Sequence, residues 1–125
     1  FQMTDLQAAI GREQLKKLPS FLKRRNEIFN IYKNAGLELI DDEDVNIQPI
    51  RYRAIMKTSN PREIINSLNL ADIKAIIPTE DWEILGPSSL FPNGLKLSRE
   101  TVSIPLYPSL TNSEIDSILS VLVKK

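Results

Sequence analysis

The sequence of 125 residues contains no cysteine and no histidine. The absence of cysteine excludes disulfides, thiolate nucleophiles and zinc sites built on cysteine. The absence of histidine removes the commonest general base and the commonest metal ligand. Any catalysis by these residues therefore depends on carboxylates, lysine, tyrosine or a bound cofactor.

The chain also lacks an excess of charge of either sign. Its 16 Lys and Arg residues balance 16 Asp and Glu residues, which argues against a nucleic-acid partner. No apolar run approaches the ~20 residues that cross a bilayer, and no signal peptide is visible. We expect a cytoplasmic location and no membrane partner. Because the chain begins at Phe1 and enters a helix almost at once, we expect it to be part of a longer protein.

Helix-start signals stand near both ends of the chain. Thr4 with Gln7, and Thr111 with Glu114, each fit a capping box, in which two side chains satisfy the first free amides of a helix. Pro19 predicts that the first helix ends and a second begins there. Apolar residues at helical spacing predict a buried stripe on the first helix. The stripe comprises Leu6, Ala9, Ile10, Leu15 and Leu18.

The middle of the chain predicts a small sheet. Alternating apolar and polar residues predict a strand over 47–59, and the apolar run 73–78 predicts another. Short helices are expected over 60–70 and after residue 91. Prolines hold 103–108 extended as a stiff lead into the last helix. This order indicates a single α+β domain, a sheet of few strands covered by helices.

Three clusters with possible chemistry also have plain structural explanations. A cationic cluster near the chain start suits phosphate binding, but interspersed acidic residues favour a solvated helix face. The acidic run 41–44 lacks the spaced ligands and glycine of a calcium loop, which favours a turn. Trp82 lines a pocket or belongs to the core, and a partly buried core position is favoured. The cationic cluster comprises Lys16, Lys17, Lys23, Arg24 and Arg25.

Arg53 is the candidate binding residue of the predicted strand over 47–59. A guanidinium on a strand face can hold a carboxylate or a phosphate through two parallel hydrogen bonds. The alternative is an ordinary surface or salt-bridged arginine. No metal site is predicted, since no spacing of ligand residues suggests one.

The two ends of the chain resemble one family. The stretch FQMTDLQAAIGREQLKKL, followed by KRRNEIFNIYKNAGL, and the closing stretch FPNGLKLSRETVSIPLYPSLTNSEIDSIL together resemble the DegT/DnrJ/StrS-type sugar aminotransferases. The resemblance extends over essentially the whole chain, more loosely over 41–90. Asp72 stands where the family has a glycine.

The resemblance implies that residues 1–125 are the C-terminal small domain of a larger fold type I enzyme that uses pyridoxal phosphate (PLP). Such enzymes move an amino group, usually from glutamate, to a nucleotide-linked keto sugar. The catalytic lysine would lie upstream in the large domain, so the resemblance implies no catalytic residue here and an inactive fragment.

For individual residues, the resemblance implies that Gln2 approaches the cofactor phosphate of the neighbouring subunit in a homodimer. Arg53 is expected to face the substrate cleft, and the rest of the chain to supply dimer contacts and active-site closure. The alternative is a stand-alone, non-catalytic binding or dimerisation module derived from such an enzyme. A nucleic-acid-binding domain is disfavoured by the balanced charge.

Overall fold

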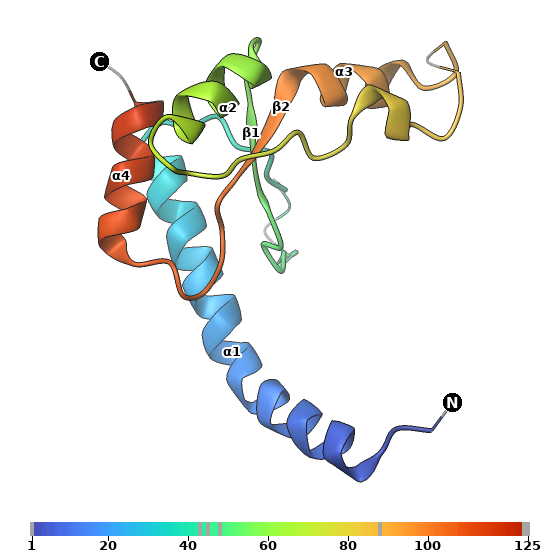
Figure 1. Cartoon of the computed structure of the whole chain (residues 1–125), viewed down its shortest axis with the longest axis vertical. Coiled ribbons are helices and arrows are strands. Elements are labelled where there is room, and N and C mark those ends of the chain that lie inside the picture. Colours follow the sequence, from blue (N-terminus) through green and yellow to red (C-terminus); the bar gives the residue numbers. More distant parts are fainter. Residues whose placement is uncertain (1, 43, 45, 48, 88, 124–125) are drawn as a thin grey trace.

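The structure, a computed structural model, describes residues 2–42, 44, 46–47, 49–87 and 89–123. Its elements are α1 (Asp5–Asn34), β1 (Ala54–Lys57), α2 (Pro61–Asn69), the 3-10 turn η1 (Asp81–Glu83), α3 (Pro92–Glu100), β2 (Thr101–Ile104) and α4 (Asn112–Leu122). The α+β class and the small, helix-covered sheet expected from the sequence are confirmed (Figure 1).

The sheet is an antiparallel pair, β1 with β2, extended on each side by a single bridge. Leu39 bridges to Met56 beside β1, and Ile76 bridges to Ser103 beside β2. The strand predicted over 47–59 was therefore too long, and the strand predicted over 73–78 is one bridge only. Proline offers no amide donor at the ends of these stretches, and Arg51, with φ of 55°, breaks the extended path.

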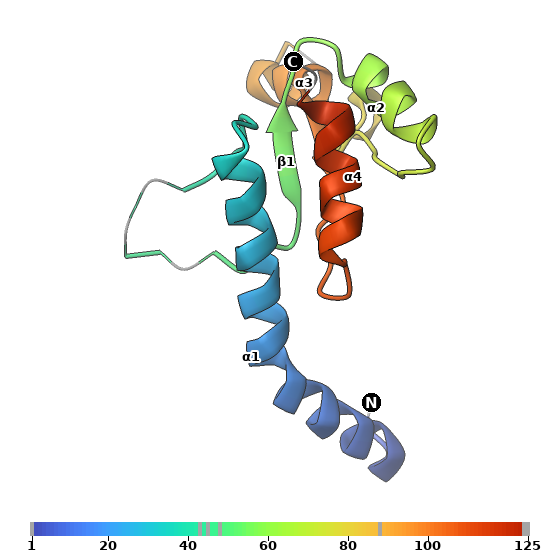
Figure 2. The same ribbon diagram turned by 90° about the vertical axis from the view of Figure 1, so that its left-hand side faces the viewer.

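The core lies between the sheet and the helices. The C-terminal half of α1 and α4 stand side by side in front of β1 (Figure 2). Both predicted capping boxes are formed, at the starts of α1 and α4. The largest fully buried side chains come from α1, α2, β2 and α4: Ile28, Phe29, Tyr32, Leu68, Val102, Ile115 and Ile118.

α1 is one continuous helix of 30 residues with Pro19 inside it. The predicted break at Pro19 is therefore wrong. A proline inside a helix removes one backbone hydrogen bond, and where the residues on both sides stay helical it bends the helix instead of ending it. Figure 2 shows α1 bending along its length.

The buried residues of α1 all lie in its C-terminal half. The predicted apolar stripe of the N-terminal half is exposed, with Leu6 70% and Leu15 65% accessible. No described residue of this chain therefore covers that stripe, which leaves a helix face that can pack against another protein surface.

Tyr32 ties α1 to the segment between β2 and α4. Its side chain is fully buried, and its hydroxyl donates to the carbonyl oxygen of Pro105 at 2.9 Å. Burial, and then the nearby Tyr107, raise the pKa of Tyr32, so the hydroxyl stays protonated and able to donate. The bond fixes the extended, proline-bracketed lead into α4 that the sequence predicted.

We expect Tyr32→Phe to lower the free energy of unfolding by about 1–2 kcal/mol, because one buried hydrogen bond is lost while the ring is kept. Equilibrium urea denaturation followed by circular dichroism measures this change. Tyr107→Phe is the control, since Tyr107 is 43% exposed. Equal stability of Tyr32→Phe and the unchanged protein would contradict the role given to this hydroxyl.

Candidate functional site

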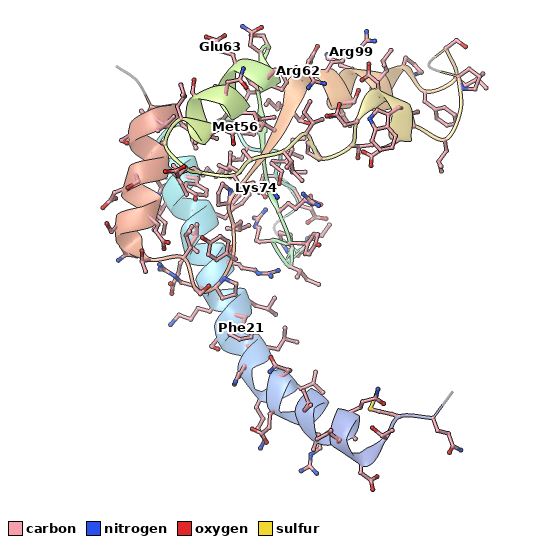
Figure 3. All side chains as sticks on the ribbon, in the orientation of Figure 1. Phe21, Met56, Arg62, Glu63, Lys74 and Arg99 are labelled. Atoms are coloured by element: carbon pink, nitrogen blue, oxygen red, sulfur yellow. The ribbon has the colours of Figure 1, made fainter. Side chains whose placement is uncertain are left out.

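A surface hollow of about 780 Å³ opens between α1, α4, the residues before β1 and the segments that follow α2 and β2. Its volume is in the range of small-molecule pockets. Arg53 lines it, together with Tyr52 and Arg25 of α1. Lys74, also on its lining, lies on the segment after α2, near the middle of the folded body in Figure 3.

Two guanidinium groups flank the ring of Tyr52. The Cζ atom of Arg25 lies 5.9 Å from the ring centroid, and that of Arg53 lies 5.5 Å from it. Both distances suit an attraction between a cation and an aromatic ring. Tyr52 is 71% exposed, so most of its surface remains open to solvent.

Among the described residues, three arginines have no carboxylate partner: Arg12 in the N-terminal half of α1, and Arg25 and Arg53 at the hollow. Within the described part of the chain, the buried Nε of Arg25 has no hydrogen-bond partner, and Nη1 of Arg53 donates to Oγ of Ser103, at 3.4 Å. The paired arginines are Arg24 with Glu27, Arg51 with Asp41, Arg62 with Glu80, and Arg99 with Asp81.

The prediction that the cationic cluster is a solvated helix face holds for its lysines but not for its two arginines. Lys16, Lys17 and Lys23 are exposed, as that prediction requires. Arg24 donates to the carbonyl oxygen of Leu110 at 2.8 Å, and Arg25 lines the hollow. Helical periodicity did not reveal Arg25 as a site residue, because its neighbour Tyr52 comes from a distant part of the chain.

Two carboxylates also line the hollow, Asp72 and Glu114. Glu114 accepts hydrogen bonds from the amide and the hydroxyl of Thr111, each at 2.7 Å, and these bonds lower its pKa. Asp72 has φ of 58°, in the left-handed region that favours glycine and that aspartate tolerates better than most residues. The turn therefore forms even though Asp72 stands where the resemblance would place a glycine.

Arg51 fixes the backbone directly ahead of Tyr52 and Arg53. Its Cζ atom lies 3.8 Å from the ring centroid of the buried Phe29, and its guanidinium donates to Oδ1 of Asp41. Its φ of 55° is costly for a residue with a long side chain, and strained backbone of this kind persists where surrounding contacts enforce it. These contacts therefore position the two residues that follow.

Asp41 belongs to the acidic run that the sequence assigned to a turn. Its carboxylate holds Arg51 in place by accepting the hydrogen bond from the guanidinium. Its side chain is 14% exposed, and Lys33 Nζ lies 2.8 Å from its Oδ2. Burial alone would raise the pKa of Asp41, but hydrogen bonds from Lys33 and Arg51, with the charge of Arg51, lower it to about 2. The carboxylate is thus ionised at all but strongly acidic pH.

The other predicted residues lie away from the hollow. Gln2 is exposed on the segment ahead of α1, toward the end of the molecule marked N in Figure 1; no described contact joins it to Arg53, and its role stays a prediction. Trp82 is 80% exposed, so the expected core position is wrong. It sits in a short 3-10 turn between two acidic residues and lines a separate hollow together with Arg62 and Arg99. Figure 3 labels these two arginines.

The described residues do not by themselves make a complete PLP site. A lysine that binds this cofactor covalently is activated in a desolvated or cation-rich pocket. Every described lysine is instead exposed: Lys16, Lys17, Lys23, Lys33, Lys57, Lys74 and Lys96. In the part of the chain that the structure describes, no helix combines the length and the apolar character needed to cross a bilayer.

The arrangement of a bent first helix, a small antiparallel sheet and a closing helix is shared with parts of solved aminotransferase structures. The sugar aminotransferase CalS13 from Micromonospora echinospora matches with a TM-score of 0.80 at 17% identity, over 98% of this chain and 35% of that chain. The aminotransferase TlmJ from Streptoalloteichus hindustanus matches with a TM-score of 0.84 at 22% identity, over 96% and 36%. Spr1654 from Streptococcus pneumoniae, in its PLP-form, matches at 0.80 with 24% identity, over 95% and 34%.

The family model of the DegT/DnrJ/EryC1/StrS aminotransferase family matches residues 1–123, and the chain belongs to this family. The spore coat polysaccharide biosynthesis protein SpsC of Bacillus subtilis is 26% identical over 139 aligned positions, covering 94% of this chain and 35% of SpsC. The uncharacterized protein MJ1066 of Methanocaldococcus jannaschii is 25% identical, covering 99% of this chain and 37% of MJ1066. The chain thus spans about a third of the length of these relatives.

We expect Asp41→Asn to lower the free energy of unfolding at pH 7 by about 1–2 kcal/mol, because charged hydrogen bonds are lost. The folded pKa of about 2 lies below the ordinary 3.8, so the stabilisation is complete above the ordinary value and is lost as the pH falls toward 2. Urea denaturation across this range should show a flatter acid decline in the variant. Asp42→Asn, at an exposed neighbour, is the matched control, and equal acid slopes in all three proteins would contradict the assignment.

Proposed function

We propose that this chain is the C-terminal small domain of a PLP-dependent sugar aminotransferase that moves an amino group from glutamate to a nucleotide-linked keto sugar. The observation that carries the proposal is the family match over residues 1–123, supported by the likeness to the sugar aminotransferase CalS13. PLP, when bound, supplies the electron sink for the transfer. The lysine that holds it belongs to the large domain of the longer protein, which is consistent with the exposure of every described lysine.

The residues of this chain would bind and orient rather than react. Arg53 offers a guanidinium without a carboxylate partner to an anionic group of the substrate. Gln2 offers an amide donor to the cofactor phosphate of a neighbouring subunit. The exposed stripe of α1, with Leu6 and Leu15 in it, would be covered by the rest of the homodimer. The cytoplasm remains the predicted compartment.

The proposal is tested on the protein as its gene encodes it, mixed with PLP. We expect the absorbance of lysine-bound PLP to appear and then to be replaced on addition of glutamate, because the amino group moves to the cofactor. Aspartate and glutamine serve as alternative donors, and nucleotide-linked keto sugars as acceptors. No bound PLP and no amino transfer would overturn the proposal and leave the non-catalytic binding or dimerisation module.

We expect Gln2→Ala to weaken PLP binding about tenfold, the effect of losing one hydrogen bond to a charged group. An equilibrium titration of the cofactor-free protein, followed by absorbance, measures the dissociation constant. Gln14→Ala is the matched control, since Gln14 is an exposed glutamine within α1. If the Gln2 and Gln14 variants bind PLP equally well, Gln2 does not contact the cofactor.

A further inference from the structure

We infer that two copies of this chain bind each other through two different surfaces, the α1 stripe of one copy and the 82–91 patch of the other. The inference rests on the proposed homodimer and names the segments that meet in it. The α1 stripe consists of the exposed residues Leu6, Ile10, Leu15 and Leu18, and the 82–91 patch consists of the exposed residues Trp82, Leu85, Leu90 and Phe91.

The 82–91 patch places four large apolar side chains in contact with solvent. Leu85 is 99% exposed and Trp82 is 80% exposed. Leu85, Leu90 and Phe91 line one hollow of about 440 Å³. Apolar side chains gathered in this way mark a surface that binds another protein, and tryptophan is among the residues that contribute most to such binding.

The patch is held in shape before a partner arrives. The carboxylate of Asp81 accepts hydrogen bonds from the hydroxyl of Ser98 and from Nε of Arg99, the latter at 2.9 Å, and these bonds tie η1 to α3. Gly86 lies so close to the ring of Phe91 that an added Cβ atom would be 2.8 Å from Cε2 of that ring. A surface that is already ordered loses less entropy when it binds.

A single copy cannot bring the two surfaces together. The patch begins in η1 and ends directly ahead of α3. Figures 1 and 2 both show α3 at one end of the molecule and the N-terminal half of α1 projecting from the other end. Contact between the stripe and the patch therefore requires two copies. A pair with two-fold symmetry makes this contact twice, because each copy supplies one stripe and one patch.

The charges beside the two surfaces are opposite in sign. Residues 78–91 contain three carboxylates and no lysine or arginine, whereas residues 5–23 carry a net charge of +2. Glu83 beside the patch, and Lys17 and Lys23 on α1, form no ion pair with any described residue. Opposite charges favour the pairing of a stripe with a patch over the pairing of two stripes or of two patches.

The first test is the dissociation constant of the dimer, measured by sedimentation equilibrium on the protein as its gene encodes it. We expect Leu15→Ser and Leu85→Ser each to weaken the dimer about tenfold or more, because each removes an apolar contact that the dimer makes twice. Leu70→Ser is the matched control, since Leu70 is an exposed leucine at the end of α2, outside both surfaces. Thermal melts confirm that each variant is folded.

The second test identifies the partner surface by chemical cross-linking. The 125 residues contain no cysteine, so one thiol can be placed on each surface. Two differently tagged copies are produced together, one with Leu15→Cys and the other with Leu85→Cys, and are treated with a short reagent that joins two thiols. We expect a covalent dimer that carries both tags. Leu70→Cys in place of Leu85→Cys is the control, and unsubstituted copies measure any background from the rest of the protein.

The inference is overturned if the protein sediments as a monomer, or if the doubly tagged product is absent or forms equally with Leu70→Cys. A dimer weakened by Leu15→Ser but not by Leu85→Ser also overturns it, because the stripe is then covered by another part of the protein. Cross-linking between two copies that both carry Leu15→Cys would show that two stripes meet, which contradicts the pairing proposed here.

The two proposals fail separately. Amino transfer by a protein that gives no doubly tagged product overturns the inference and leaves the proposed function standing. A doubly tagged dimer that neither binds PLP nor transfers an amino group overturns the proposed function and supports the non-catalytic dimerisation module.

Discussion

The packing of the C-terminal half of α1 against the sheet is the constraint on which the rest of the structure depends. Phe29 and Tyr32 are both buried there, and each contacts a segment next to the hollow. The ring of Phe29 packs against the guanidinium of Arg51, and the hydroxyl of Tyr32 donates a hydrogen bond to the carbonyl oxygen of Pro105. One turn of helix thus fixes both the residues that precede β1 and the chain that leads into α4. Without this turn, neither wall of the hollow would be held.

The same helix also gives the domain a second face. Its N-terminal half carries apolar residues that no described part of this chain covers, while its C-terminal half belongs to the core. A helix that is amphipathic along its whole length but buried along only half of it is suited to join two bodies. Membership of a family whose relatives are about three times longer fits this division.

Local signals made part of this structure predictable. The capping boxes at Thr4 and Thr111, the α+β class and the extended 103–108 segment follow from side-chain chemistry within a few residues. The break expected at Pro19 failed because helical residues on both sides outweigh one lost hydrogen bond. Trp82 was misplaced because its size suggests a core position, while its acidic neighbours hold it in an exposed turn.

The candidate site was only partly predictable, because local signals reveal single residues but not contacts between distant parts of the chain. Arg53 was found from a predicted strand, although in the structure β1 begins one residue later, at Ala54. Arg25 and Tyr52 meet only after the chain folds, and no sequence spacing encodes that contact. The most direct test of the account is a crystal structure of the protein as its gene encodes it. The account predicts that another protein surface covers Leu6 and Leu15 of α1, while the guanidinium of Arg51 stays on the ring of Phe29. A structure that leaves Leu6 and Leu15 exposed to solvent would contradict it.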